Sequence, residues 1–194
     1  MNTPLSARTL HIKNMVCNRC IRVVREELEQ LGFNIINIKL GEVELMEEPT
    51  AGELKTIAQT LSANGFELLD SRKSQLIEKV KNAIIELIHQ SDEISIRMNY
   101  SQLIQDRVGA DYHYLSTVFS TTEGMTIEKY LILQRIERTK ELLLYNELSL
   151  SQIADKLGYS SVAHLSAQFK KVTGLTPSAF KKLTGEQRTS LDQV

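Results

Sequence analysis

The stretch SLSQIADKLGYSSVAHLSAQFKKVTGLTPSAFKK, residues 149–182, decides how the second half of this 194-residue chain folds. Part of it occurs twice, because HLSAQFKKVTGLT at 164–176 echoes YLSTVFSTTEGMT at 114–126. Leucine, serine, phenylalanine, glycine and threonine recur at an offset of 50 residues, as from Leu115 to Leu165. Repetition of this kind indicates one structural unit used twice.

Each copy has the signals of a short capped helix, a tight turn and a second helix that ends at glycine. In the second copy, Ser149 and Gln152 form a capping box, Gly158 permits the turn, and Ser160 or Ser161 caps the helix that follows. This order is the helix-turn-helix pattern. We predict a first module at about 99–124 and a second at about 149–173.

A long helix is predicted between the copies, at about 126–145, where aliphatic residues recur with helical spacing. About twenty helical residues span roughly 30 Å. One turn of B-DNA is about 34 Å, so a rigid spacer of this length can place two second helices in successive major-groove segments. The pattern suits a monomer that reads two adjacent grooves.

Charge is distributed unevenly, although the net charge is only −1. From Lys129 onward there are ten Lys or Arg residues against six Asp or Glu residues, whereas residues 1–72 hold eight against ten. The C-terminal part can therefore lie near phosphates, and the N-terminal part is repelled by them.

Residues from about 75 to 185 resemble the DNA-binding domain of the AraC/XylS family of transcriptional regulators. The resemblance is carried by Ile153-Ala154, Gly158-Tyr159, Phe169-Lys170, Gly174 and Thr176-Pro177-Ser178. It implies a regulator of transcription that binds double-stranded DNA by inserting the second helix of each module into the major groove.

Carried over residue by residue, the resemblance implies a set of positions that face the bases. They are His113, Ser116 and Thr117 in the first module and Val162, Ala163, His164 and Ala167 in the second, with Lys170 and Lys171 near phosphates. The alternative interpretation is that these histidines and lysines are ordinary surface residues. None of the base-facing residues is Arg, Asn or Gln, so DNA shape or a homodimer would supply part of the specificity.

The first seventy residues show a different pattern, which predicts the order βαββαβ. An alternating strand at 9–13 precedes a helix at 21–31, and a hairpin follows with Ile36, Ile38 and Leu40 on one face. Thr50 and Glu53 form a capping box for a second helix, and FELL reads as a last strand. We therefore expect an α+β, ferredoxin-like domain at 1–72 and an all-α domain at 73–194.

Both cysteines lie in MVCNRC, residues 15–20, between the first strand and the first helix. The sequence shows no membrane span and no secretory signal, so we expect a cytoplasmic protein with no membrane partner, in which a static disulfide is disfavoured. A metal chelate, a redox pair and plain packing all tolerate this spacing.

Residues 8–70 resemble the heavy-metal-associated domain of copper chaperones and transport ATPases. Met15, Cys17, Cys20 and Phe66 match its pattern, whereas Asn14 and Val16 replace the usual Gly and Thr. The resemblance implies Cu(I) or another soft metal ion at Cys17 and Cys20. Zinc would require two further ligands, and His11, the only nearby nitrogen, is expected to face solvent.

Together these patterns predict a non-enzymatic transcriptional regulator whose N-terminal domain senses a soft metal or derives from a metal-binding domain. An alternative is a metallochaperone whose helical half docks on a protein. A thiol oxidoreductase comes third, since the sequence shows no active-site partner for the cysteines.

Overall fold

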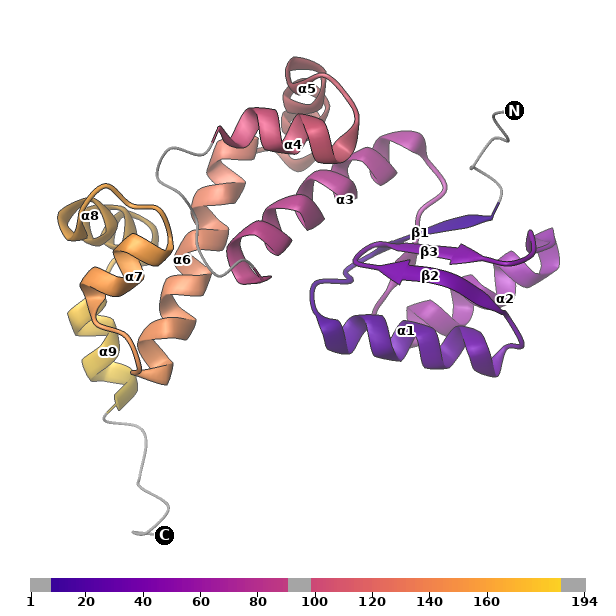
Figure 1. The fold of residues 1–194 in the computed structure, drawn as a ribbon, viewed down its shortest axis with the longest axis horizontal. Helices are drawn as coiled ribbons and strands as arrows, with labels where there is room; N and C mark the ends of the chain where they lie inside the picture. Colours follow the sequence, from indigo (N-terminus) through magenta and orange to yellow (C-terminus); the bar gives the residue numbers. More distant parts are fainter. Residues whose placement is uncertain (1–7, 91–98, 186–194) are drawn as a thin grey trace, which may run out of the picture. The chain divides into compact units, whose positions relative to one another are not determined.

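The computed structural model describes residues 8–90 and 99–185. The chain divides into two compact units, Met1–Ala83 and Ile84–Val194 (Figure 1). In the described ranges we find no helix that combines the length and the apolar character needed to cross a membrane.

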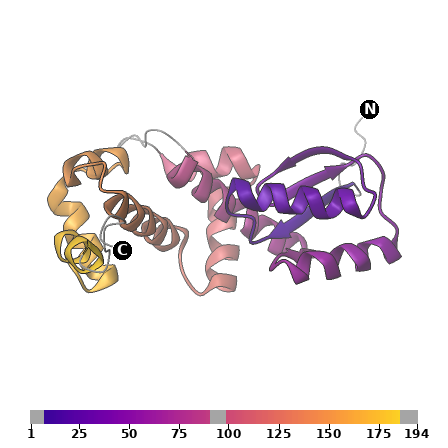
Figure 2. The ribbon, with the colours of Figure 1, turned by 90° about the horizontal axis from the view of Figure 1, so that it is seen from below.

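The N-terminal unit contains a four-stranded sheet with helices in the predicted order βαββαβ. Its elements are β1 (Thr9–Lys13), α1 (Asn18–Gln30), β2 (Ile35–Lys39), β3 (Glu42–Leu45), α2 (Ala51–Ala63) and β4 (Glu67–Leu68). The strands lie in the order β2-β3-β1-β4, and all neighbours are antiparallel. Seen from below in Figure 2, α1 and α2 lie side by side on one face of this sheet.

Alternation along the strands places the core between the sheet and these two helices. Ile12 and Val43 from the strands, Val24 and Leu28 from α1, and Ile57 from α2 are all fully buried. The predicted capping box at the start of α2 is present, because Thr50 accepts from the Glu53 amide and the Glu53 carboxylate accepts from the Thr50 amide.

The prediction that Ile36 shares the inward face of the hairpin is wrong. The side chain of Ile36 is 54% exposed. The register shifts between Ile35, which pairs with Leu45, and Asn37, which pairs with Glu44. Such an irregularity adds a residue to one strand, so the alternation of faces is reset at that point.

Helix α3 (Arg72–Ile85) begins where the helix after residue 72 is expected, and the division between the units falls later, within this helix. Its first part is tied to the sheet domain by polar contacts. The Asn14 amide donates to the Glu78 carboxylate at 3.1 Å, and Lys79 Nζ lies 2.7 Å from Glu42 Oε1. A π-helical segment, η1 (Glu86–Gln90), follows.

The C-terminal unit contains only helices among its described residues. After the end of α3 and η1 come α4 (Tyr100–Val108), α5 (Tyr112–Glu123), α6 (Ile127–Tyr145), α7 (Leu150–Lys156), α8 (Val162–Thr173) and α9 (Pro177–Gly185). The spacer helix α6 thus agrees closely with the predicted 126–145, and the pairs α4–α5 and α7–α8 agree with the two predicted modules.

The repeated residues occupy repeated positions in the structure. Leu115 and Phe119 on α5, like Leu165 and Phe169 on α8, are buried with at most 1% of the side chain exposed. Gly124 and Gly174 end the two helices in the left-handed conformation, at φ of 68° and 80°. The sequence repeat at an offset of 50 residues therefore corresponds to two modules with the same packing.

Candidate nucleic-acid interface

Each second helix is held at its start by a side-chain cap. In the second module, Ser161 Oγ accepts from the His164 amide at 3.1 Å, so Ser161 and not Ser160 is the cap. In the first module, Asp111 Oδ1 accepts from the Tyr114 amide at 3.1 Å. These caps satisfy amides that the helix itself leaves unpaired, and they fix where each helix begins.

The outward face of α8 contains the predicted base-facing residues. Ala163, His164 and Ala167 are exposed and Val162 is half-buried, while Lys170 and Lys171 are exposed toward the end of the helix. This face is small and smooth at its centre and positively charged at one end. A surface of that kind can approach a DNA groove closely and contact the phosphate backbone beside it.

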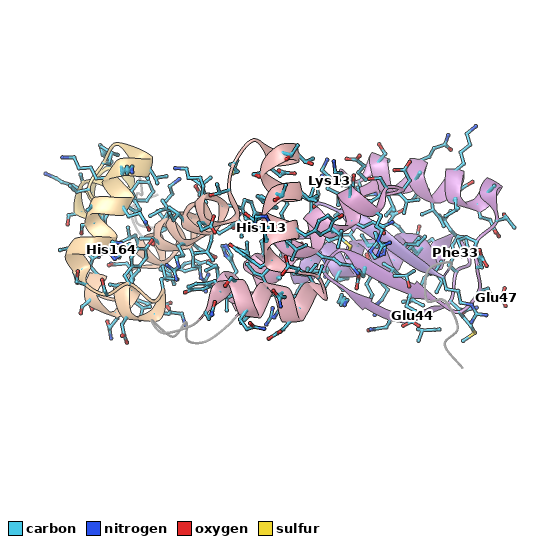
Figure 3. The ribbon with its side chains drawn as sticks, turned by 90° about the horizontal axis from the view of Figure 1, so that it is seen from above. Lys13, Phe33, Glu44, Glu47, His113 and His164 are labelled. Atoms are coloured by element: carbon cyan, nitrogen blue, oxygen red, sulfur yellow. The ribbon has the colours of Figure 1, made fainter. Side chains whose placement is uncertain are left out.

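His164 is held by neighbours rather than projecting freely. Its Nδ1 lies 3.2 Å from Ser160 Oγ, and its ring meets Tyr159 edge to face, with centroids 5.4 Å apart. When the serine hydroxyl donates to Nδ1, the ring proton is on Nε2. The imidazole, labelled in Figure 3, then has one remaining donor, the Nε2–H group.

The outward face of α5 is chemically different. His113 and Thr117 are exposed and Ser116 is half-buried, and the helix contains no Lys or Arg. Thr117 Oγ1 donates to the His113 carbonyl at 2.9 Å, and Thr121 Oγ1 donates to the Thr117 carbonyl at 2.7 Å. Because their protons are used within the helix, these hydroxyls offer acceptor oxygens to a ligand.

Tyr114 also belongs to this face, although it is not among the positions that the family resemblance implies. Its side chain is 51% exposed. The signal was available, since the 50-residue offset aligns Tyr114 with His164. An exposed aromatic ring at this position can make apolar contact with a thymine methyl group or a sugar.

The two second helices share an orientation. Helices α5 and α8 lie on either side of the spacer α6 in Figure 1, and their axes have a similar direction in Figure 2. A shared direction is what two successive groove segments on one face of a duplex require.

The start of α5 is also tied to the spacer helix. The Tyr112 hydroxyl donates to Glu128 Oε1 at 2.6 Å. Burial and this hydrogen bond raise the pKa of Tyr112, and the same bond lowers the pKa of Glu128. The first module therefore has a polar attachment to α6 beside its apolar core.

The two thiols lie together at the N-terminus of α1. Cys17 is the N-cap, Cys20 is in the first turn, and their sulfur atoms are 3.5 Å apart. The backbone amide of Cys20 lowers the pKa of the Cys17 thiol, and the nearby charge of Arg19 acts in the same direction. Met15, just before them, is fully buried and so belongs to the core.

This donor set fits a two-coordinate soft metal better than zinc. Within the described ranges, no group of three or more His, Cys, Asp or Glu residues is placed to hold a metal ion. His11 is not turned to solvent, contrary to expectation, because its side chain is only 14% exposed and its Nδ1 lies 3.4 Å from Glu42 Oε1. Two thiolates suffice for an ion that accepts linear coordination, whereas zinc takes four ligands.

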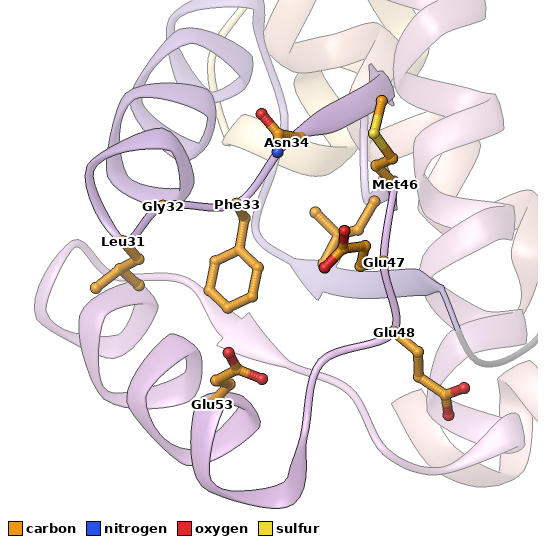
Figure 4. A pocket seen from close by; sticks show the side chains of 9 residues that line it. Leu31, Gly32, Phe33, Asn34, Met46, Glu47, Glu48 and Glu53 are labelled. Atoms are coloured by element: carbon orange, nitrogen blue, oxygen red, sulfur yellow. The ribbon is translucent and has the colours of Figure 1, made fainter.

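A small pocket lies near the other end of α1 (Figure 4). It is lined by Leu31, Gly32, Phe33, Asn34, Leu45, Met46, Glu47, Glu48 and Glu53. Glu53 is engaged in the cap of α2. The acidic rim repels phosphates, so this pocket is not part of a nucleic-acid interface.

Comparison with known proteins agrees with this geometry. Residues 104–183 match the model of a helix-turn-helix domain family. The chain is 26% identical over 166 residues to YtdP, an uncharacterized HTH-type transcriptional regulator of Bacillus subtilis, across 77% of this chain and 20% of that protein. It is 29% identical over 101 residues to the Msm operon regulatory protein of Streptococcus mutans, across 52% of this chain and 35% of that protein.

The chain thus spans about a fifth and about a third of the length of these two relatives. Among solved structures, the C-terminal domain of AraT, a response regulator from Geobacillus stearothermophilus, superposes with a TM-score of 0.51 at 23% identity. That superposition covers 62% of this chain and 93% of the other, and it indicates a shared fold.

Proposed function

We propose that the chain is a DNA-binding transcriptional regulator of the AraC type, because residues 104–183 match a helix-turn-helix domain family and its relatives include regulatory proteins. The observation that carries the proposal is the pairing of α5 and α8, two capped helices with exposed outer faces and similarly directed axes on either side of α6. Each would enter one of two adjacent major-groove segments of the same duplex.

In this proposal the two modules contribute unequally. Lys170 and Lys171 on α8 neutralise phosphates and supply most of the salt-dependent affinity. His164 offers one donor to a base edge, and Ala167 leaves room for a thymine methyl group. The uncharged α5 adds Tyr114 and His113, so its contribution depends on shape more than on charge.

Few of these side chains can make the bidentate hydrogen bonds that discriminate strongly between bases. We therefore propose that part of the specificity comes from the shape of the DNA, or from a homodimer that doubles the number of contacted segments. Sizing of the complex on its selected DNA separates one bound copy from two.

The test is selection of duplexes from a random library by the full chain, followed by affinity measurement at several salt concentrations. We expect affinity that falls steeply with salt, and Lys171→Gln should reduce the slope of log K against log salt by about 0.9. Ala167→Asp puts a carboxylate on the exposed face of α8 and should weaken binding by about tenfold or more. Ala51→Asp, at an exposed position of α2, is the matched control and should leave affinity unchanged.

Failure of the wild type to enrich any duplex, or a salt slope near zero, contradicts the proposal. That outcome would favour the second candidate of a metallochaperone with a protein-docking half. An equal loss of DNA affinity in Ala167→Asp and Ala51→Asp would also contradict the proposal, because the effect would then not be specific to the exposed face of α8.

We also propose that the N-terminal unit is a ferredoxin-like domain of the heavy-metal-associated type, which binds a soft metal such as Cu(I) at Cys17 and Cys20 and thereby changes DNA affinity. The adjacent sulfur atoms and the lowered pKa of Cys17 support this site. DNA affinity is measured with and without Cu(I), for the wild type and for Cys17→Ser/Cys20→Ser. A Cu(I) effect only in the wild type supports sensing, and equal affinity in all four arms excludes it.

A further inference from the structure

Arg135 lies near the middle of α6 with its guanidinium group between two tyrosine rings. Its Cζ atom is 4.8 Å from the centroid of Tyr100 and 5.4 Å from the centroid of Tyr159. It also donates from Nη2 to the Tyr100 hydroxyl. A guanidinium group within about 6 Å of an aromatic ring centroid is attracted to that ring, and Arg135 meets this condition for both tyrosines.

The two rings belong to different modules. Tyr100 is the first residue of α4, and Tyr159 lies in the turn between α7 and α8. One side chain of the spacer helix therefore contacts both helix-turn-helix modules at once. The aliphatic residues of α6 also contact both modules, but through non-directional packing.

The rings of Tyr100 and Tyr159 are the main partners of the Arg135 guanidinium group. Among the described residues no carboxylate lies within ion-pair distance of Arg135, and its Nε atom is buried without a hydrogen-bond partner. By contrast, Arg138 on the same helix has a carboxylate, Glu141, 2.6 Å from its Nη1 atom. Arg135 is half-buried, and the buried Nε without a partner is a feature that it shares with Arg138. The two ring contacts are therefore what distinguishes Arg135, and they favour a position of its guanidinium group close to both rings.

The contact continues from Tyr159 into α8. Tyr159 is 2% exposed, and its hydroxyl donates to Gln168 Oε1 at 2.7 Å. Its ring also supports the ring of His164 on the outward face. The placement of α8 is thus linked through Tyr159 to Arg135, and through Arg135 to the first module.

We propose that Arg135 is a positioning residue that fixes the placement of the two modules relative to each other and so sets the spacing of the two DNA segments they contact. The effect of Arg135 on the spacing of the DNA segments rests on the proposed function, whereas its effect on the placement of the modules does not. Arg135→Lys keeps the charge and removes the planar group that stacks on both rings. The modules then remain folded around their own cores but lose their fixed separation.

The first experiment needs no DNA. Nitroxide labels are attached in a Cys17→Ser/Cys20→Ser background at Thr121→Cys and Lys171→Cys, two exposed positions related by the repeat. The label-to-label distance distribution is measured by pulsed electron spin resonance. We expect a narrow distribution with Arg135 present, and a clearly broader one in Arg135→Lys and in Tyr100→Leu, which removes one ring.

Arg138→Lys is the matched control, since it changes an arginine of the same helix that does not lie between the rings. It should keep the narrow distribution. Equal widths for the unsubstituted background and Arg135→Lys, or equal broadening in Arg138→Lys, overturn the proposal. Circular dichroism confirms that each variant retains its helices.

The second experiment uses the duplex selected by the full chain. Its two contacted segments are moved apart or together by one base pair, and affinities are compared with that for the original spacing. The wild type should prefer the original spacing by about tenfold, and Arg135→Lys by less than about threefold. The difference between these preferences, about threefold or more, is what the loss of one cation–π contact is expected to cause. Affinity for the α8 segment alone should stay within about twofold.

A simple loss of stability would weaken binding to all spacings equally. An unchanged spacing preference in Arg135→Lys would therefore overturn the proposal that Arg135 sets the spacing of the contacted DNA segments. If the wild type binds no duplex, the proposed function fails, and the label distances still decide whether Arg135 positions the modules.

Discussion

The hydroxyl of Tyr112 donates to the carboxylate of Glu128 across 2.6 Å, joining the first residue of α5 to the first turn of α6. The bond crosses the Gly124 turn, so it closes the loop between the first module and the spacer helix. Its acceptor is ionised, which makes it stronger than a neutral hydrogen bond.

Tyr112→Phe keeps the ring and removes this bond. We expect the free energy of unfolding of the helical unit to fall by about 1 kcal/mol. Urea unfolding followed by the helical circular dichroism signal measures the change. Tyr114→Phe, on the same helix with its ring exposed, is the control and should be neutral. Equal effects of the two substitutions would show that the bond to Glu128 contributes nothing specific.

Much of the fold could be predicted because the residues that define it act locally. Capping residues such as Ser149 and Thr50, and the glycine that ends α8, follow rules of helix ends that need no tertiary information. The buried pair Leu165 and Phe169 likewise follows a local rule, since residues four apart lie on the same face of a helix.

The missed features depend on contacts distant in sequence. The shift that exposes Ile36 depends on its pairing with β3, and the alternation of the strand itself does not reveal it. The early part of α3 joins the sheet domain through Glu78 and Lys79, which read as ordinary surface residues of an amphipathic helix. Arg135 also reads as a surface residue until Tyr100 and Tyr159 are placed beside it.

The turn between β2 and β3 requires glycine at position 41. Gly41 has a φ of 75°, and a Cβ atom there would lie 2.1 Å from Asn82 Nδ2 on α3. We expect Gly41→Ala to destabilise the chain by about 1 to 3 kcal/mol, through backbone strain and displacement of this buried amide. Gly52→Ala, in a helix with open space around it, is the control and should be neutral or stabilising by up to about 1 kcal/mol.

Urea unfolding of both glycine variants, with the wild type alongside, measures this difference. If Gly41→Ala matches Gly52→Ala, the turn tolerates a side chain and the tight approach of α3 is not required for stability.

Cys17 should react as a thiolate at lower pH than an ordinary cysteine. The Cys20 amide and Arg19 lower its pKa, so the ionised fraction at neutral pH is increased. Alkylation by iodoacetamide, followed by mass spectrometry in Cys20→Ser, gives the rate as a function of pH. The half-maximal rate should lie below the usual thiol value of about 8.5. A midpoint at or above that value would mean that the helix N-terminus does not activate Cys17.

His11 should make the sheet domain sensitive to mild acid. Burial lowers the pKa of His11, and the charges of Lys79 and Lys39 act in the same direction, while Glu42 opposes them. The unfolded chain therefore binds a proton at higher pH than the folded chain does, so stability is fully present above the unfolded pKa of about 6.5 and declines as the pH falls below it. Glu42 contributes little in this range, because its own pKa is lowered from 4.5, where Lys39 and Lys79 outweigh the effect of burial.

Hydrogen exchange of peptides from β1 and β3 in the full chain, corrected for the intrinsic effect of pH, measures this loss between pH 7.5 and pH 5.5. The wild type should exchange faster at the lower pH, and His11→Asn should remove most of that difference because it has no proton to gain. His113→Gln changes an exposed histidine on α5 and should retain the wild-type response. A pH response that survives in His11→Asn would assign the acid sensitivity to another group.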